Sequence, residues 1–344
     1  MQSYLDTLAN GDPLSRPEAE SAMREMMSGD AHAEHVAALL MGVRTRGETL
    51  DELVGFTKVM REFAVSVDPG DPHAVDLCGT GGDGADTFNI STTASFVAAG
   101  AGVTVAKHGN RSVSSKSGSA DVLEALGIQI DLRKDGVEHC LQEAGIAFLF
   151  APYFHPAMKH VMPVRKSLGV RTFFNILGPL CNPAGVTRQL VGAFNTDTAE
   201  TMVKILARLD ADHVITVHSR DGMDEFSISD ATTVFEYDAA ESGAVPRSRE
   251  VGPEKHDLER QRATELEGGT AIENANILKG ILSGQDRSAR RDVVVLNAAY
   301  ALHASDRFDS LEDCLDAAHE SIDSGAAMEK LKALIDVSQQ APTG

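Results

Sequence analysis

The chain has 344 residues, of which 42% are hydrophobic, so it can form one large domain with a smaller one attached and bury a substantial core. Its formal net charge of −20 argues against nucleic acid as a partner, because nucleic-acid binding relies on basic groups that neutralise phosphates. No segment is long and apolar enough to span a bilayer, and the first residues lack the basic and apolar regions of a signal peptide. We therefore expect a cytoplasmic protein without a membrane partner.

The N-terminal part of the chain predicts helices. Ser15 to Glu18 and Thr49 to Glu52 are capping-box patterns, and each begins an amphipathic run. The apolar faces of these runs contain Ala22, Met23, Met26, Met27, Val36, Leu39, Leu40, Val43, Leu53, Phe56, Val59, Met60 and Phe63. Packing in a core is the expected role, but so many apolar faces exceed what a small unit can bury alone. We therefore also expect a homodimer formed through the N-terminal helices.

Strands and helices alternate after the turn-rich segment 68–72. Strands are predicted at 74–78, 103–106, 146–150, 189–194 and 213–218, and helices at 92–100, 120–126, 137–144 and 199–209. Segment 242–268 is polar and irregular, and no structure is predicted for it. The expected fold is α/β: a small N-terminal α-helical domain (1–70) and a larger α/β domain (71–344) with a mostly parallel central sheet.

Two loops rich in glycine and hydroxyl groups follow predicted strands. In the first, Gly79, Gly81, Gly82 and Gly84 precede a helix that begins near Ser91, as in a phosphate cradle. The loop has neither the dinucleotide fingerprint nor the P-loop lysine, and an ordinary glycine-rich turn is the alternative. The second loop, 107–119, has three cations and five serines, which suits a multiply charged phosphate ester better than a solvated basic loop.

Asp224 and Glu225 follow a predicted strand and the Gly222 turn. Mg²⁺ prefers one or two carboxylates, with water and substrate phosphates completing its coordination. Alone, the pair would be read as solvated surface carboxylates, but two phosphate-binding loops favour a metal site. Cys78, Cys140, Cys181 and Cys314 show no paired spacing, so we expect reduced thiols.

Ordered motifs along the chain resemble the anthranilate phosphoribosyltransferase family. They are Gly-Thr-Gly-Gly-Asp from Gly79, Asn-Ile-Ser-Thr from Asn89, Lys-His-Gly-Asn-Arg from Lys107, the segment Gly169 to Leu180, and Arg-Asp-Gly-Met-Asp-Glu from Arg220. The resemblance implies a magnesium-dependent glycosyltransferase of tryptophan biosynthesis. Such an enzyme transfers the 5-phosphoribosyl group of phosphoribosyl pyrophosphate to the amine of anthranilate and releases pyrophosphate. It also implies that helices from about 163–180 join the N-terminal domain.

The resemblance also implies a set of site residues. Lys107, Asp224 and Glu225 would be catalytic, and Ser91 would complete a magnesium site with Asp224 and Glu225. Anthranilate would contact Gly79, His108, Asn110, Arg165 and Pro179. Phosphoribosyl pyrophosphate would contact Gly79, Gly82, Asp83, Thr87, Asn89, Ile90, Ser91, Thr92, Lys107, His108, Gly109, Asn110, Arg111, Ser112, Val113, Ser114, Ser115 and Ser119.

The chemistry of an arylamine argues against a general base. Because the amine is already a neutral nucleophile, His108 and His155 are not assigned that role. Two alternatives remain at this stage. One is a pyrimidine nucleoside phosphorylase-like enzyme, which would not need the acidic pair, and the other is a non-catalytic relative that binds nucleic acid, which the acidic composition disfavours.

Overall fold

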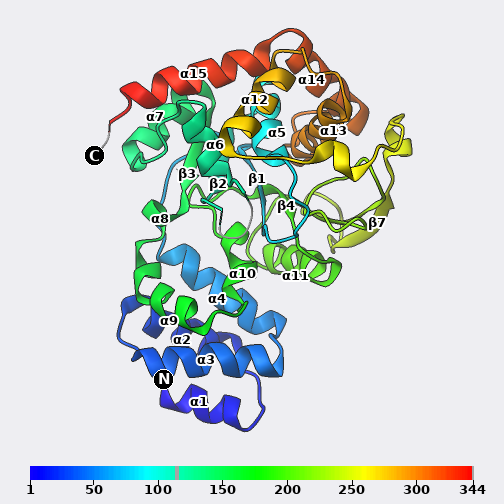
Figure 1. The fold of residues 1–344 in the computed structure, drawn as a ribbon. Coiled ribbons are helices and arrows are strands. Elements are labelled where there is room, and N and C mark those ends of the chain that lie inside the picture. The colour runs from blue at the N-terminus through cyan, green and yellow to red at the C-terminus, as the bar shows by residue number, and fades with distance from the viewer. Residues whose placement is uncertain (113–115, 343–344) are drawn as a thin grey trace.

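The structure, a computed structural model, describes residues 1–112 and 116–342 and has a helical N-terminal unit beside a larger α/β unit (Figure 1). Four helices begin the chain: α1 Gln2–Ala9, α2 Arg16–Ser28, α3 Ala33–Arg46 and α4 Leu50–Glu62. Both predicted capping boxes are present, at the starts of α2 and α4. The capping signals therefore located these two helix starts correctly.

A later segment packs against the N-terminal helices. It contains α8 Ala151–Phe154, the 3-10 helix η1 Pro156–His160, α9 Met162–Leu168, α10 Phe174–Leu177 and the 3-10 helix η2 Gly178–Leu180. Helix α9 contacts α3, and α10 contacts α4. The rings of Phe56 and Phe173 stack with centroids 4.3 Å apart. One hydrophobic core thus holds residues far apart in the sequence.

The apolar faces of the N-terminal helices are used inside the chain. Met23, Met26, Met27, Leu39 and Leu40 are all at most 1% exposed. The argument that these particular faces would remain for a dimer contact is therefore wrong. Helix α2 packs on α4 and η1, and α3 packs on α1 and α9. Helices α10 and α11 (Thr196–Ala207) cover part of α4.

The sheet has seven strands in the order β3-β2-β1-β4-β5-β6-β7. Their bounds are β1 Val75–Gly79, β2 Val105–Gly109, β3 Ile146–Phe150, β4 Arg188–Gly192, β5 His213–Ser219, β6 Thr232–Asp238 and β7 Arg247–Val251. Strands β1 to β5 pair in parallel, and β6 and β7 are antiparallel. The predicted fold class, a small helical domain with a mostly parallel α/β domain, is confirmed.

The two antiparallel strands were missed. In β7, four of five residues are exposed and polar, as expected at the edge of a sheet, so no alternating apolar pattern marks it. Strand β6 is rich in β-branched and aromatic residues, which is a strand signal present in the sequence. Part of segment 242–268 is therefore ordered structure, including β7 and the 3-10 helices η3 Pro253–His256 and η4 Ala263–Leu266.

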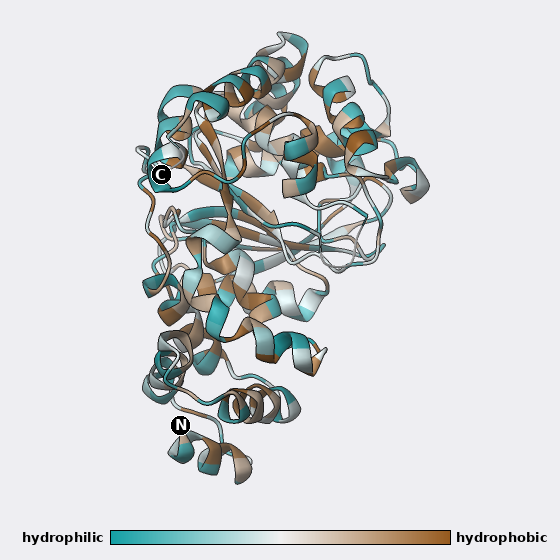
Figure 2. Cartoon of the chain, turned by 60° about the vertical axis from the view of Figure 1, so that its left-hand side comes forward, coloured by the Kyte–Doolittle hydropathy of each residue, from teal (hydrophilic) through white to brown (hydrophobic). Residues whose placement is uncertain are grey.

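The remaining helices cover the sheet on two sides (Figure 1). They are α5 Ile90–Gly100, α6 Ser119–Ala125, α7 Lys134–Ala144, α11 Thr196–Ala207, α12 Ala271–Leu282, α13 Ala289–Ala304, α14 Leu311–Asp323 and α15 Ala326–Gln340. Helices α5 and α13 pack on one side, and α11 packs on the side that continues into the helical unit. Figure 2 shows hydrophobic segments along the central strands and mixed colouring along the amphipathic helices.

In the described ranges 1–112 and 116–342, every helix is too short or too polar to cross a membrane.

The domain boundary between residues 70 and 71 stays a prediction. It falls in the irregular segment between α4 and β1, and each side has its own hydrophobic core.

Candidate active site

The first glycine-rich loop joins β1 to α5. Gly81, Gly82 and Gly84 have φ of 62°, 71° and 75°, a region that residues with a Cβ rarely adopt. The loop is anchored at its far end by a β-bridge between Thr87 and Glu267. Helix α5 begins immediately afterwards at Ile90, so its free backbone N–H groups lie where the loop ends. These features form a cradle suited to an anion.

The second loop leaves the neighbouring parallel strand, β2, and ends at α6. Because β1 and β2 are parallel, their carboxyl ends lie at the same edge of the sheet. The Asn89 amide donates to the carbonyl of Ser117 at 3.3 Å, which ties the two loops together. Within the second loop, the Ser119 hydroxyl donates to the carbonyl of Asn110 at 3.2 Å. The structure therefore brings both predicted phosphate-binding segments into one place.

The acidic pair reaches the first loop from the segment after β5. The backbone N–H of Gly81 donates to Asp224 Oδ2 at 2.7 Å. The backbone N–H of Ser91 donates to Glu225 Oε1 at 3.1 Å. Asp224 N also donates to Asp83 Oδ2 at 3.4 Å, so a third carboxylate is nearby. The predicted metal ligands Ser91, Asp224 and Glu225 thus lie together, although 134 residues of sequence separate Ser91 from Glu225.

These carboxylates lie close together without an ion-pair partner, although the charge of Lys107 partly offsets that of Glu225. Burial, followed by the charge of Asp83, raises the pKa of Asp224, and burial together with the charge of Asp224 raises the pKa of Glu225. Among residues 1–112 and 116–342, no lysine or arginine forms an ion pair with either side chain. A divalent cation would supply the missing positive charge, and an all-oxygen donor set suits Mg²⁺. The residues present fit that ion.

Lys107 points inward from β2 and is 4% exposed. Its ammonium donates to the carbonyl of Leu77 and to Ser91 Oγ, the latter at 3.4 Å. Burial lowers the pKa of Lys107, and the buried carboxylate of Asp76 opposes that shift. The contact with Ser91 places the cation at the start of α5, beside the proposed metal ligands.

Gly79 gives a test of this close packing. A Cβ built at Gly79 would lie 2.5 Å from Asp224 Oδ2, which is too close for the carboxylate to remain in place. We expect Gly79→Ala to lower kcat by about tenfold or more, because a displacement of about 1 Å at a reacting centre can reduce rates 10²-fold. Gly280→Ala on α12 is the control, since the Cβ position of Gly280 has no neighbour closer than 3.7 Å and its φ is not positive. Steady-state kinetics on both variants makes the comparison, and equal activity would show that Asp224 needs no fixed position.

Arg165 lies on α9, in the segment that packs against the N-terminal helices. Its guanidinium carbon is 5.0 Å from the ring centroid of Phe174, and Nη1 is 3.7 Å from Met162 Sδ. Burial lowers the pKa of the Arg165 guanidinium. In the described part of the chain this side chain has no acidic partner, so a half-buried cation remains free to bind an anion.

The other residues predicted for anthranilate line the strand ends. The Cys78 thiol donates to the carbonyl of Pro179 at 3.6 Å, which places Pro179 beside the end of β1 and Gly79. His108 and His155 are buried, with ring centroids 5.2 Å apart. Burial lowers the pKa of His108 well below its usual range and that of His155 to about 4. Both imidazoles are therefore neutral near pH 7, and a charged histidine is not part of this site.

Some predicted site residues contact other parts of the chain or lie outside the described residues. Arg111 pairs with Asp121 at 2.9 Å and with Glu124 at 2.5 Å, so its charge is directed away from the loops. The side chains of Ile90 and Thr92 are buried on α5, so a ligand there would contact their backbone groups. Val113, Ser114 and Ser115 lie outside the described residues. The roles assigned to all of these stay predictions.

Two residues in contact with the first loop were missed. Arg171 donates to the carbonyl of Gly82 at 2.8 Å while its guanidinium lies 4.7 Å from the ring centroid of Phe194. Asn274 donates to Asn89 Oδ1 at 2.9 Å. Arg171 could have been predicted from its place inside the Gly169 to Leu180 motif. No sequence pattern marks Asn274, on α12, because its partner Asn89 is distant in sequence.

Two domain families match the chain. The glycosyl transferase family helical bundle domain matches residues 2–64, and the glycosyl transferase family a/b domain matches residues 71–328. A protein of Salinibacter ruber named anthranilate phosphoribosyltransferase is 74% identical over 341 residues, which cover 99% of both chains. A protein of Moorella thermoacetica with the same name is 48% identical over 97% of both chains.

Solved structures agree over nearly the whole length. Anthranilate phosphoribosyltransferase from Thermus thermophilus superposes with a TM-score of 0.90 at 37% identity, covering 98% of this chain and 99% of that one. The Saccharomyces cerevisiae enzyme in complex with phosphoribosyl pyrophosphate and magnesium has a TM-score of 0.88 at 28% identity, covering 98% of each chain. The same yeast enzyme with 4-fluoroanthranilate has a TM-score of 0.86 and 28% identity, covering 98% of this chain and 97% of that one.

Proposed function

Because this chain belongs to the anthranilate phosphoribosyltransferase family, we propose that it transfers the 5-phosphoribosyl group of phosphoribosyl pyrophosphate to the amine of anthranilate. It is a glycosyltransferase, and the reaction releases pyrophosphate as a step of tryptophan biosynthesis. The observation that most directly supports the proposal is that the glycine loop, Lys107 and the acidic pair lie together at one edge of the sheet.

The donor occupies the glycine loop in this proposal. Backbone N–H groups of the loop and the start of α5 donate hydrogen bonds to the phosphate oxygens, and Lys107 adds a positive charge at the same place. Asp224 and Glu225, with Ser91, would hold Mg²⁺. When bound, the ion neutralises charge on the pyrophosphate as it leaves. The remaining predicted contacts, among them Gly82, Asp83, Thr87, Asn89 and Ser119, are proposed to position the donor.

The acceptor is positioned rather than deprotonated. Arg165 offers a guanidinium fork whose geometry matches a carboxylate, and the neutral His108 and Asn110 lie on the loop that faces it in this proposal. Bond breaking at the anomeric carbon runs ahead of bond making, so the protein acts mainly by stabilising the leaving group and orienting the amine. No group of the chain is required to remove the amine proton before attack.

The direct test follows the loss of anthranilate fluorescence. Purified protein with phosphoribosyl pyrophosphate and magnesium should consume anthranilate, and inorganic phosphate with a pyrimidine nucleoside should give no product. A salt-dependent DNA-binding measurement addresses the non-catalytic alternative. Phosphorolysis without consumption of anthranilate would contradict the proposal and favour the nucleoside phosphorylase alternative.

We further propose a homodimer through the outer side of the N-terminal helices. Tyr4, Leu5 and Ala37 remain partly exposed there, unlike the buried methionines. Ala37→Glu should shift the protein toward monomer in light scattering at micromolar concentration, because it places a charge in the contact. Ala333→Glu on α15 is the matched control, since Ala333 is also partly exposed on a helix. A wild-type protein that is monomeric at that concentration would contradict the dimer.

The proposed location is the cytoplasm. All four cysteines are unpaired and buried, as in proteins of reducing compartments.

A further inference from the structure

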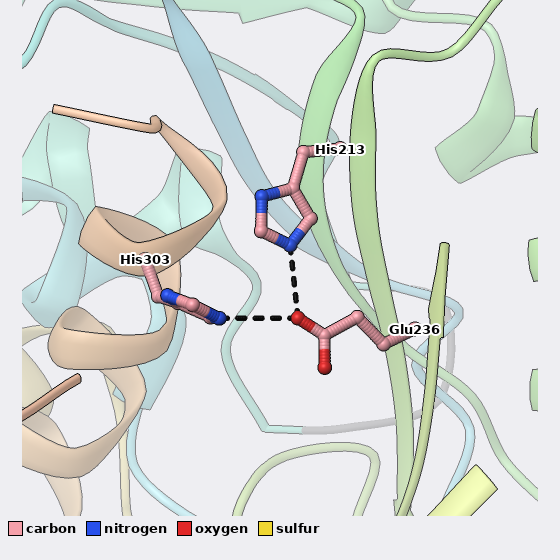
Figure 3. Close-up of side chains that lie close together, drawn as sticks. All are labelled: His213, Glu236 and His303. Atoms are coloured by element: carbon pink, nitrogen blue, oxygen red, sulfur yellow. Dashed lines mark hydrogen bonds and ion pairs between the residues drawn. The ribbon is translucent and has the colours of Figure 1, made fainter. Parts of the chain in front are cut away.

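A second cluster of ionisable side chains lies at the opposite edge of the sheet from the glycine loops. His213 opens β5, Glu236 lies near the end of the antiparallel strand β6, and His303 lies in the last turn of α13. The glycine loops follow the carboxyl ends of the parallel strands, whereas His213 is at an amino end. Figure 3 shows the two imidazoles directed at the same carboxylate oxygen. The transferase site does not use this cluster.

The three side chains present nitrogen and oxygen atoms at the spacing of metal ligands. His213 Nε2 is 2.9 Å and His303 Nε2 is 3.1 Å from Glu236 Oε1. One ligand atom from each residue lies within 4.8 Å of the other two. Zinc bonds to histidine nitrogen and carboxylate oxygen are about 2.0–2.2 Å, so neighbouring tetrahedral ligands are separated by about 3.3 Å. Small side-chain shifts would place one ion among the three atoms.

A surrounding set of contacts orients these groups. His213 Nδ1 is 2.6 Å from Asp306 Oδ1, an arrangement that directs the other ring nitrogen, Nε2, into the cluster. Asp306 is in turn 3.3 Å from Arg188, through its second oxygen. Arg249 pairs with Glu236 Oε2, so Oε1, which both imidazoles face, is the oxygen left to bind a metal. A carboxylate that holds the outer nitrogen of a histidine is the usual support of a zinc ligand.

We propose that His213, Glu236 and His303 bind a divalent transition-metal ion, with Zn²⁺ as the preferred occupant. Two imidazoles and one carboxylate are borderline ligands that suit zinc, whereas magnesium and calcium prefer oxygen alone. The side chains of His213, Glu236 and His303 are 3%, 15% and 30% exposed, so the cluster opens to solvent on the His303 side. Water takes the fourth position, and the ion joins the sheet to α13.

The proton balance of the cluster is part of the proposal. Both ring nitrogens of His213 lie on carboxylate oxygens, Nδ1 on Asp306 and Nε2 on Glu236. Because carboxylate oxygens only accept, Nδ1 and Nε2 each carry a proton in the metal-free cluster. The facing charged groups are His303, Glu236, Asp306, Arg249 and Arg188. On binding, the Nε2–H bonds of His213 and His303 break, both Nε2 lone pairs bind Zn²⁺, the two protons pass to solvent, and each imidazole keeps its proton on Nδ1.

Calorimetry on the intact, tag-free protein tests the site. The protein is treated with chelator, returned to millimolar magnesium to occupy the acidic pair, and titrated with zinc chloride. We expect one zinc per chain bound at micromolar or tighter affinity, with at least one proton released in buffers of different ionisation enthalpy. Saturating zinc should raise Tm by about 2–4 °C. No saturable binding, or binding without proton release, would overturn the proposal.

Variants locate the site independently of transferase activity. His303→Gln should abolish the zinc-dependent rise in Tm and leave the kinetics of the transferase unchanged, because His303 lies outside the active site. Asp306→Asn should weaken zinc about 10–100-fold, and asparagine tolerates the positive φ of 55° at this position. His139→Gln on α7 is the matched control, since His139 is also a partly exposed helical histidine. Equal zinc binding in His303→Gln and His139→Gln would assign the ion elsewhere and overturn the proposal.

Discussion

The double variant Asp224→Asn with Glu225→Gln is expected to lose at least about 10²–10³-fold in kcat/KM, a loss typical of removing a group that stabilises charge in the transition state. Both replacements keep the shape of the side chains and remove the charge that would hold magnesium. The fold should persist, because neutral amides relieve the repulsion between these half-buried carboxylates. Without magnesium, Tm of the variant should equal or exceed that of the wild type.

The control for charge is Glu312→Gln with Asp313→Asn. These neighbouring carboxylates are exposed on α14, so the variant makes the same change in net charge outside the site. Magnesium should raise Tm of the wild type and of this control, but not of the Asp224/Glu225 variant. Full activity of the Asp224/Glu225 variant, or wild-type activity in excess chelator, would show that the acidic pair holds no essential metal.

The second large effect is expected at the acceptor. Arg165→Ala should raise KM for anthranilate much more than KM for phosphoribosyl pyrophosphate, with a loss on the order of 2–5 kcal/mol. The size follows from the position of Arg165, which is half-buried over Phe174 and has no acidic partner in the described ranges of the chain. Arg165→Lys should recover little, because an ammonium cannot form the bidentate contact of a guanidinium. Initial rates with each substrate varied in turn measure both constants.

Two further variants test whether the effect on KM is specific to Arg165 and to anthranilate. Lys166→Ala removes a positive charge from the exposed neighbour on the same helix and should leave both KM values unchanged. Lys107→Met should weaken phosphoribosyl pyrophosphate more than anthranilate, since Lys107 contacts Ser91 at the start of α5. If Arg165→Ala instead weakens both substrates equally, the residue is a structural or phosphate-side cation and does not bind the anthranilate carboxylate.

Local chemistry in the sequence was sufficient for the loops and the helix starts. Positive φ is accessible mainly to glycine, so the cluster from Gly79 to Gly84 could belong only to a tight turn. Ser15 and Thr49 each find their capping partner three residues later, within one turn of helix. Because β1 and β2 are parallel, two loops that follow consecutive strands necessarily emerge at one edge. The turn and the caps follow from residues close in sequence, and the shared edge was expected from the alternation of strands with helices.

The remaining features depend on contacts between distant segments, which no local pattern encodes. The methionine-rich face of α2 was open to two interpretations, and only the packed chain shows that α4 and η1 cover it. Strand β7 pairs with the edge that β6 offers, and Arg171, which lies between α9 and α10, contacts Gly82 across 89 residues of sequence. The zinc site is likewise assembled by three elements, and its histidines are 90 residues apart. Hydrophobic burial is non-directional, so the sequence shows which faces are apolar, while packing of the whole chain selects the partner of each face.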